Sequence, residues 1–235
     1  MNFPAIYPLI MFGALLAGVA LSRPRQARLG LTGLQRLAIG LGAFCGGMLG
    51  SKLPFALADP RGAFCAQAWI SDGKTILFGL VGGYLGVEIA KAIADVRTKT
   101  GDSFAVPVAV AIGIGRLGCF VGRCCYGTPT SLPWGTDFGD GIPRHPTQLY
   151  ETAFHLSAAA VLVLLERRNL FPTQRLKLYL LAYCGYRILS EFVRPEIPIA
   201  GGLTGYQWSA AVLIPVLCWL WVRDQRGEAT RTSTE

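Results

Sequence analysis

Two arginines lie inside strongly apolar stretches of this sequence. Arg116 belongs to the run at 108–121, and Arg187 belongs to a second run at 178–193. An ionised side chain near the centre of a membrane span costs at least about 2.5–3.5 kcal/mol, so it usually faces a partner charge or a polar cavity. One partner follows in the sequence, because Glu191 lies four residues after Arg187 on the same helix face. The spacing therefore predicts either a structural ion pair or part of a charged cavity.

The composition predicts that these stretches cross a lipid bilayer. The chain has 235 residues, of which 52% are hydrophobic and 15% charged, whereas soluble domains carry about 25% charged residues. A span needs roughly 20 apolar residues to cross about 30 Å of hydrocarbon. We expect an all-α integral membrane protein with about seven transmembrane helices, forming one polytopic domain over residues 1–235. The predicted spans are 6–22, 34–55, 75–94, 103–122, 147–165, 176–193 and 203–222.

The positions of lysine and arginine predict the orientation of the chain. Most of them lie in the first, third and fifth loops and in the C-terminal tail, which the positive-inside rule assigns to the cytoplasm. The N-terminus is then outside, the C-terminus is cytoplasmic, and the loop 127–146 between the fourth and fifth helices is outside. The net charge of +8 follows from this pattern and requires no nucleic-acid partner. Five arginines outside these cytoplasmic segments, Arg116 and Arg187 among them, lie at outer ends of spans: Arg116, Arg123, Arg144, Arg187 and Arg194.

These outer arginines predict a cationic cavity at the depth of the lipid headgroups. Arginine offers bidentate hydrogen bonds to phosphate oxygens, so the cavity suits an anionic headgroup. In the outer loop 127–146, the aromatic side chains of Trp134 and Phe138 would suit the level of the lipid headgroups. After this loop, Thr147 is expected to cap the N-terminus of the next helix.

At these residues the sequence resembles the prolipoprotein diacylglyceryl transferase family. The family signature Gly-Arg-x-Gly-Asn-Phe-x-Asn-x-Glu-x-x-Gly shares its frame with the segment from Gly115 to Gly127. Two further stretches that are typical of the family follow it: Pro-Thr-x-Leu-Pro-Trp-Gly and Arg-His-Pro-x-Gln-Leu-Tyr-Glu. A helix with the pattern Tyr/Arg/Glu/Arg and a Gly-Gln motif come later in the chain. The corresponding positions are 129–135, 144–151, the set Tyr183, Arg187, Glu191 and Arg194, and 205–207.

The resemblance implies a seven-helix enzyme of the bacterial inner (cytoplasmic) membrane. Such an enzyme moves a diacylglyceryl group from phosphatidylglycerol to a cysteine thiol of a lipoprotein precursor, without a cofactor. Arg116 would hold the donor headgroup, and Arg187 would neutralise the leaving phosphate as its charge develops. Tyr183 and Glu191 would line the same cavity. The resemblance further implies substrate-binding roles for Gly118, Cys119, Cys124, Gly127, Arg144, Gln148, Tyr150, Glu151, Arg194 and Gln207.

The sequence departs from the family pattern in polar signature positions. Cys119 and Gly122 stand where the family has asparagine, and Cys124 stands where it has glutamate. We therefore interpret the chain as a divergent member that transfers the group to a thiol or to another acceptor.

The histidine of the family's His-Gly-Gly-Leu motif is also replaced, with Phe78 at the likeliest matching position. That histidine is the family's usual candidate for the base. Of the two histidines in this chain, His155 lies mid-span and is expected to be a packed core residue. His145 lies in the outer loop motif and is the predicted base.

Three cysteines of the signature segment, Cys119, Cys124 and Cys125, lie at the predicted oxidising face, where disulfides persist. Cys65 is a candidate partner, a thiolate beside arginine would be reactive, and simple packing is the plainest alternative. No metal site is predicted, because no histidine accompanies a two-plus-two zinc spacing. Two other functions therefore compete with the transferase: a membrane thiol-redox protein that uses Cys124 and Cys125, and a non-catalytic lipid-binding member of the same fold.

Overall fold

The computed structural model of the chain describes residues 3–58 and 75–232, and this part is almost entirely helical. Six of its helices are long and apolar enough to cross a membrane; α7 has 16 residues and continues into a short 3-10 turn, η2. The predicted all-α membrane fold is confirmed, and the protein is a multi-pass membrane protein. The helices are α1 (Phe3–Ala27), α2 (Gly33–Ala58), α4 (Ile76–Ile93), α5 (Gly101–Val121), α6 (Thr147–Arg167), α7 (Arg175–Ser190), η2 (Glu191–Val193) and α8 (Gly205–Thr232).

The contacts divide the chain into two compact units. One unit combines Met1–Arg23 with Gly101–Glu235, and the other is Pro24–Thr100. The first therefore contains most of α1 together with α5, α6, α7 and α8, whereas the second contains α2 and α4. That these units act as one polytopic domain stays a prediction.

Glycines bring α2 and α4 into close contact in the second unit. A Cβ atom added at Gly82 would lie 2.8 Å from the Cα of Gly50, and one added at Gly86 would lie 3.0 Å from the Cα of Gly46. Any larger side chain would push the two backbones apart. Such small-residue contacts are how helices associate in lipid, where apolar burial drives no association.

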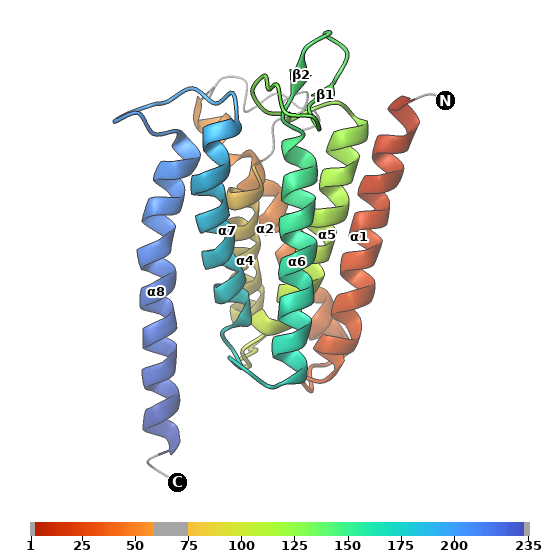
Figure 1. Ribbon diagram of the computed structural model, residues 1–235. Coiled ribbons are helices and arrows are strands. Elements are labelled where there is room, and N and C mark those ends of the chain that lie inside the picture. Colours follow the sequence, from red (N-terminus) through yellow and green to blue (C-terminus); the bar gives the residue numbers. More distant parts are fainter. Residues whose placement is uncertain (1–2, 59–74, 233–235) are drawn as a thin grey trace. The chain divides into compact units, whose positions relative to one another are not determined.

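In the first unit, α5 packs against α6 and α7, and α7 packs against α8 (Figure 1). Ion pairs tie these helices together at the end away from the α5–α6 loop. Arg175 of α7 lies 3.2 Å from Asp102 of α5, and Lys177 lies 2.8 Å from Asp224 of α8. Within this unit α1 begins at the loop end and α8 ends at the other (Figure 1). This arrangement agrees with termini on opposite sides; the assignment of those sides stays a prediction.

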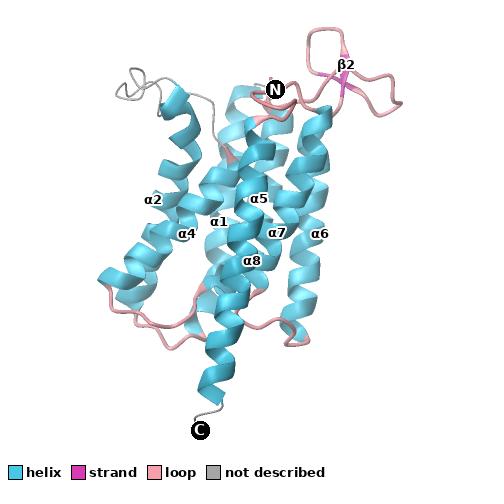
Figure 2. Cartoon of the chain, turned by 90° about the vertical axis from the view of Figure 1, so that its left-hand side faces the viewer, coloured by secondary structure: helices cyan, strands magenta, loops and turns pink. Residues whose placement is uncertain are grey.

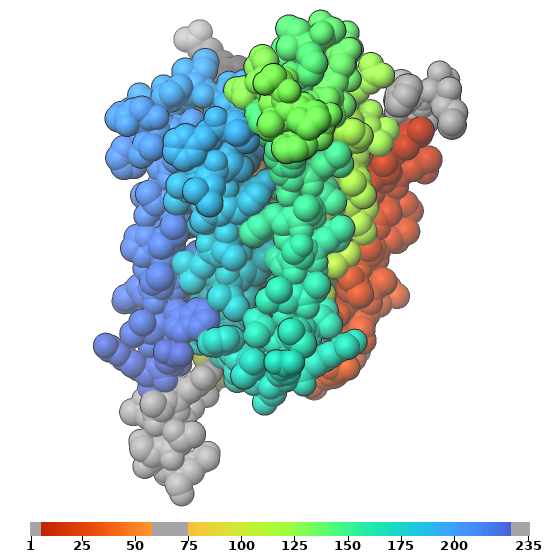
Figure 3. Space-filling model, in the orientation of Figure 1, coloured from red at the N-terminus to blue at the C-terminus, as the bar shows by residue number. Residues whose placement is uncertain are grey.

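The loop from α5 to α6 carries the strands of the described chain, a two-stranded antiparallel hairpin of β1 (Thr136–Asp137) and β2 (Pro143–Arg144) (Figure 2). It forms a compact lobe at the end of α6, green in Figure 3. That Trp134 and Phe138 lie at the headgroup level stays a prediction. Phe138 is only 8% exposed because it stacks on Tyr126 and meets Phe120 edge to face, whereas Trp134 is 56% exposed.

Candidate functional site

The end of α5 is shaped by a Schellman turn in which arginine replaces the usual glycine. The N–H of Cys124 donates to the carbonyl of Cys119, and the N–H of Arg123 donates to the carbonyl of Phe120. Arg123 accordingly has φ 51°, and Cys125 follows with φ 61°. Residues other than glycine are strained in this left-handed conformation, so contacts with the surrounding structure must hold the turn. The turn brings Cys124 back towards the last turn of α5.

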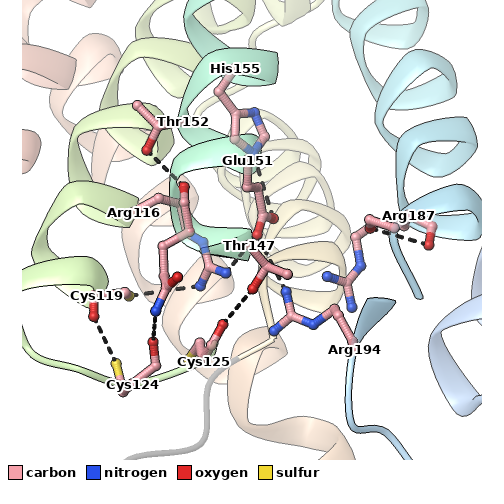
Figure 4. A network of polar contacts seen from close by, with 12 residues as sticks. Arg116, Cys119, Cys124, Cys125, Thr147, Glu151, Thr152, His155, Arg187 and Arg194 are labelled. Carbon is pink, nitrogen blue, oxygen red and sulfur yellow. Dashed lines mark hydrogen bonds and ion pairs between the residues drawn. The ribbon is translucent and has the colours of Figure 1, made fainter. Parts of the chain in front are cut away.

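Arg116 of α5 and Glu151 of α6 form a buried ion pair across the two helices. The Nη2 of Arg116 lies 2.7 Å from an Oε of Glu151, and the two side chains are 7% and 1% exposed. Arg194, which follows η2, approaches the same carboxylate at 3.6 Å (Figure 4). The hydroxyl of Tyr183 donates to the other Oε at 2.6 Å. Glu151 is therefore the carboxylate on which α5, α6 and α7 converge.

Glu191 is the second buried carboxylate of this cluster. It pairs with Arg187, which confirms the ion pair predicted from their spacing, and lies 3.9 Å from Arg194. It also accepts a hydrogen bond of 2.9 Å from the hydroxyl of Thr204. The Arg187 guanidinium lies 4.3 Å from the centre of the Tyr206 ring. This cation–π contact connects α7 with α8.

The arginine cluster, defined as Arg116, Arg187 and Arg194 with Glu151 and Glu191, carries three positive charges against two negative ones. In the part of the chain that the structure describes, the Nε atoms of all three arginines are buried without a hydrogen-bond partner. A buried donor of this kind costs free energy until it is satisfied. The cluster is therefore suited to one additional anion that accepts hydrogen bonds.

His155 lies fully buried beside this cluster. Its Nδ1 is 2.8 Å from the hydroxyl of Tyr179, and its Nε2 is 3.8 Å from Glu151. The prediction of a buried histidine is correct, but sequence reasoning missed its carboxylate neighbour. The available signal was the four-residue spacing between Glu151 and His155 on one face of α6.

His145, the predicted base, lies in the outer loop. Its Nδ1 is 3.3 Å from the hydroxyl of Tyr150, which accepts a hydrogen bond of 2.7 Å from Trp134. Arg144 pairs with Asp140 at 2.7 Å and lies 5.1 Å from the centre of the Tyr126 ring. Among the contacts of the described residues, neither His145 nor Arg144 joins the arginine cluster. Because Arg144 hydrogen-bonds Asp140, the pKa of that exposed carboxyl is lowered.

The remaining predicted binding residues have mainly positioning contacts. Gln148 is fully buried and donates to the carbonyl of Cys124 at 2.6 Å. Gly118 faces α1, and a Cβ there would lie 3.4 Å from Ile10, whereas one at Gly127 would lie 2.7 Å from the Cβ of His145. Gln207 accepts from the N–H of Thr204 and donates to the carbonyl of Ile188, so it fixes α8 to α7.

The N-terminus of α6 differs from the prediction. The capping position is taken by Pro146, without a side-chain hydrogen bond, and Thr147 is the first helical residue, so the expected Thr147 cap is wrong. Its hydroxyl instead donates to the carbonyl of Cys125 at 2.8 Å. Thr147 thus anchors the strained turn to α6.

The three cysteines of the turn come together. The sulfur atoms of Cys119, Cys124 and Cys125 all lie within 4.8 Å of one another as free thiols. Hydrogen bonds from Cys119 and then Cys124 lower the pKa of the Cys125 thiol, and Arg116 adds to this effect. The hydrogen bond with Cys119 raises the pKa of Cys124. The predicted candidate partner Cys65 lies outside the described residues.

The comparisons with known proteins agree with the resemblance seen in the motifs. A family model described as prolipoprotein diacylglyceryl transferase matches residues 5–223. A phosphatidylglycerol–prolipoprotein diacylglyceryl transferase of Clostridium tetani is 31% identical over 193 residues, which cover 77% of each chain. Enzymes of the same name from Cupriavidus pinatubonensis and Geobacter sulfurreducens are each 32% identical, over 83% and 87% of this chain and 76% and 78% of their own. The chain belongs to the prolipoprotein diacylglyceryl transferase family.

Proposed function

We propose that the protein transfers a diacylglyceryl group from an anionic, phosphatidylglycerol-like phospholipid to a thiol or another acceptor at the outer face of the bacterial inner membrane. The observation that carries this proposal is the buried arginine cluster, in which three guanidinium groups face two carboxylates. A scaffold that only spans the membrane has little use for so many charges at this depth. Family membership gives the proposal its reaction, and lipoprotein biosynthesis is the corresponding process.

The donor phosphate is the anion that the cluster would take. A phosphodiester carries one negative charge, which would balance the excess positive charge of the cluster. Its oxygens accept hydrogen bonds from guanidinium N–H groups, and the buried Nε atoms of Arg116, Arg187 and Arg194 offer such donors. The acyl chains would remain in the bilayer beside the helices.

In the proposed reaction the acceptor thiolate attacks the glycerol carbon that bears the phosphate ester. A C–S bond forms, the C–O bond to the phosphate breaks, and glycerol phosphate leaves with the electron pair. The leaving group gains negative charge as the bond breaks, so preorganised cations lower the barrier. Arg116 would hold the headgroup, and Arg187, oriented by Glu191 and Tyr206, would stabilise the departing phosphate. Tyr183 would act through Glu151, to which it donates.

The acceptor must lose its proton before it attacks. We propose His145 as the base, since it is half-buried in the outer loop, where an acceptor from the outer face would arrive. Its contact with Tyr150 would orient the imidazole ring. Replacing His145 by alanine should therefore slow transfer while leaving donor binding close to the wild-type value.

The proposal is tested with purified protein, labelled phosphatidylglycerol and a cysteine-containing lipoprotein-precursor peptide. Glycerol phosphate release and a diacylglyceryl thioether on the peptide should appear in equal amounts. Arg116→Ala and Arg187→Ala should lose donor binding by some thirtyfold or more, because truncating one charged contact to a buried phosphate costs about 2–5 kcal/mol. Lysine should restore little, since it lacks the planar fork. The matched control is Arg168→Ala, an exposed arginine after α6.

The two competing functions give different results in the same assay. A thiol-redox protein, which the proximity of the three sulfur atoms would favour, should cycle Cys124 or Cys125 between thiol and disulfide without consuming phospholipid. A non-catalytic lipid-binding protein should bind the donor but release no glycerol phosphate. Either result would refute the transferase, and so would wild-type donor binding by both alanine variants.

A further inference from the structure

The three-cysteine cluster, defined as Cys119, Cys124 and Cys125, has a specific backbone that holds its sulfur atoms together. Cys119 is in the last turn of α5, and the Schellman turn folds Cys124 back onto it through the N–H of Cys124. Cys125 then adopts φ 61°, and its carbonyl is held by the hydroxyl of Thr147. The carbonyl of Cys124 is held by Gln148. The thiol of Cys124 donates to the carbonyl of Cys119 at 3.7 Å, and the three sulfur atoms lie within 4.8 Å of one another.

We propose that this cluster binds a soft monovalent metal ion, Cu(I), through three thiolates. The inference is independent of the transferase proposal. Soft sulfur ligands select ions such as Cu(I). With metal–sulfur bonds of about 2.3 Å, three sulfurs around one ion lie about 4 Å apart. The observed upper limit of 4.8 Å requires inward shifts of less than about 1 Å.

The number of ligands favours Cu(I) over Zn²⁺. Closed zinc sites use four protein ligands in a tetrahedron. In the described part of the chain, the cluster contains no fourth cysteine, histidine or carboxylate. A trigonal three-sulfur site is therefore complete for Cu(I), whereas a structural zinc site would lack a ligand. The ions share their sulfur chemistry, so competition between them belongs in the test.

Neighbouring charges and access both suit such a site. The Arg116 Nη1 lies 3.7 Å from the sulfur of Cys119, so a negatively charged copper–thiolate group would meet a fixed cation. In Figure 4 the cysteines lie at the edge of the arginine cluster, beside Arg116. Cys125 is exposed while the other two are half-buried, so an ion could enter from the outer loop and be held below its surface.

The test is a titration of the reduced, full-length protein in detergent with Cu(I) against a chromogenic Cu(I) chelator, without phospholipid. One copper per chain is expected. X-ray absorption at the copper edge should show three sulfurs at about 2.3 Å. Cys119→Ser, Cys124→Ser and Cys125→Ser should each weaken binding by more than about 100-fold, because changes outside the ligand set alone cost about 10–100-fold. Cys218→Ser, an exposed cysteine of α8, is the matched control and should bind like the wild type.

Several results would overturn the proposal. One is wild-type copper binding by any one of the three serine variants, and another is equal weakening in Cys218→Ser. A stable disulfide within the cluster in protein isolated without reductant, resistant to Cu(I), would show a redox site instead. Displacement of copper by equimolar Zn²⁺ would show that the ligand set is not selective for a soft monovalent ion. The absorption spectrum of the wild type tests the geometry even if a variant fails to fold.

Discussion

Replacing Glu151 by glutamine should destabilise the protein strongly, because this carboxylate balances the arginine cluster. Glutamine keeps the size of the side chain and removes only its charge. Arg116 at 2.7 Å and Arg194 at 3.6 Å would lose their shared partner, and the cluster would hold three positive charges against the single carboxylate of Glu191. Removing one partner of a buried ion pair costs about 3–5 kcal/mol. For a chain of this size that corresponds to a fall in Tm of roughly 6–20 °C.

Thermal unfolding is measured in detergent, and it is monitored through the reactivity of cysteines that are buried in the folded protein. Asp95→Asn is the matched control, since Asp95 and Arg97 form an ion pair 3.7 Å long whose side chains are 88% and 93% exposed. Exposed pairs contribute little, so this variant should unfold close to the wild-type temperature. The double variant Glu151→Gln with Arg116→Gln should regain part of the loss, because it removes one uncompensated charge.

If Glu151→Gln unfolds within about 2 °C of the wild type, a shift worth about 1 kcal/mol or less, Glu151 does not balance the charge of the arginine cluster. A double variant that loses the full sum of the two single effects would also contradict this role of Glu151. In that case Arg116 and Glu151 would contribute independently, and the cluster would not act as one electrostatic unit.

The other predictions concern the topology, the α2–α4 contact and the cysteines. Reporter fusions within 127–146 should report the outside of the cell, and a cytoplasmic signal would contradict the proposed location of the site. Gly86→Leu should cost about 1–3 kcal/mol by overpacking, because even a Cβ would lie 3.0 Å from the Gly46 Cα. Gly40→Leu, where a Cβ meets nothing within 4 Å, should unfold like the wild type in the same assay. Cys125→Ser should still release glycerol phosphate, because a thioether formed on the enzyme would be a dead end; complete loss would favour the redox function.

Much of this fold could be predicted from the hydrophobicity of each segment and from the spacing of residues within it. Six helices are long and apolar enough to be recognised as membrane spans from their own segments, independently of the rest of the chain. The ion pair of Arg187 with Glu191 was likewise predictable, since both residues lie on one helix with a fixed repeat. The family motifs indicated Arg116 and Arg194 as residues of one site.

Only the tertiary structure decided how the helices bring these residues together. Glu151 was predicted as one binding residue among many, and it becomes the central carboxylate because α6 packs against α5 and faces the end of α7. Cys119 lies close to Cys124 because the chain reverses at Arg123. This arginine has a left-handed backbone conformation, for which glycine is the usual residue. Phe138 is buried because its ring stacks on that of Tyr126, a contact that the hairpin loop creates. Distances between residues on different helices depend on how segments far apart in the sequence pack together. The periodicity of a single helix does not predict these distances.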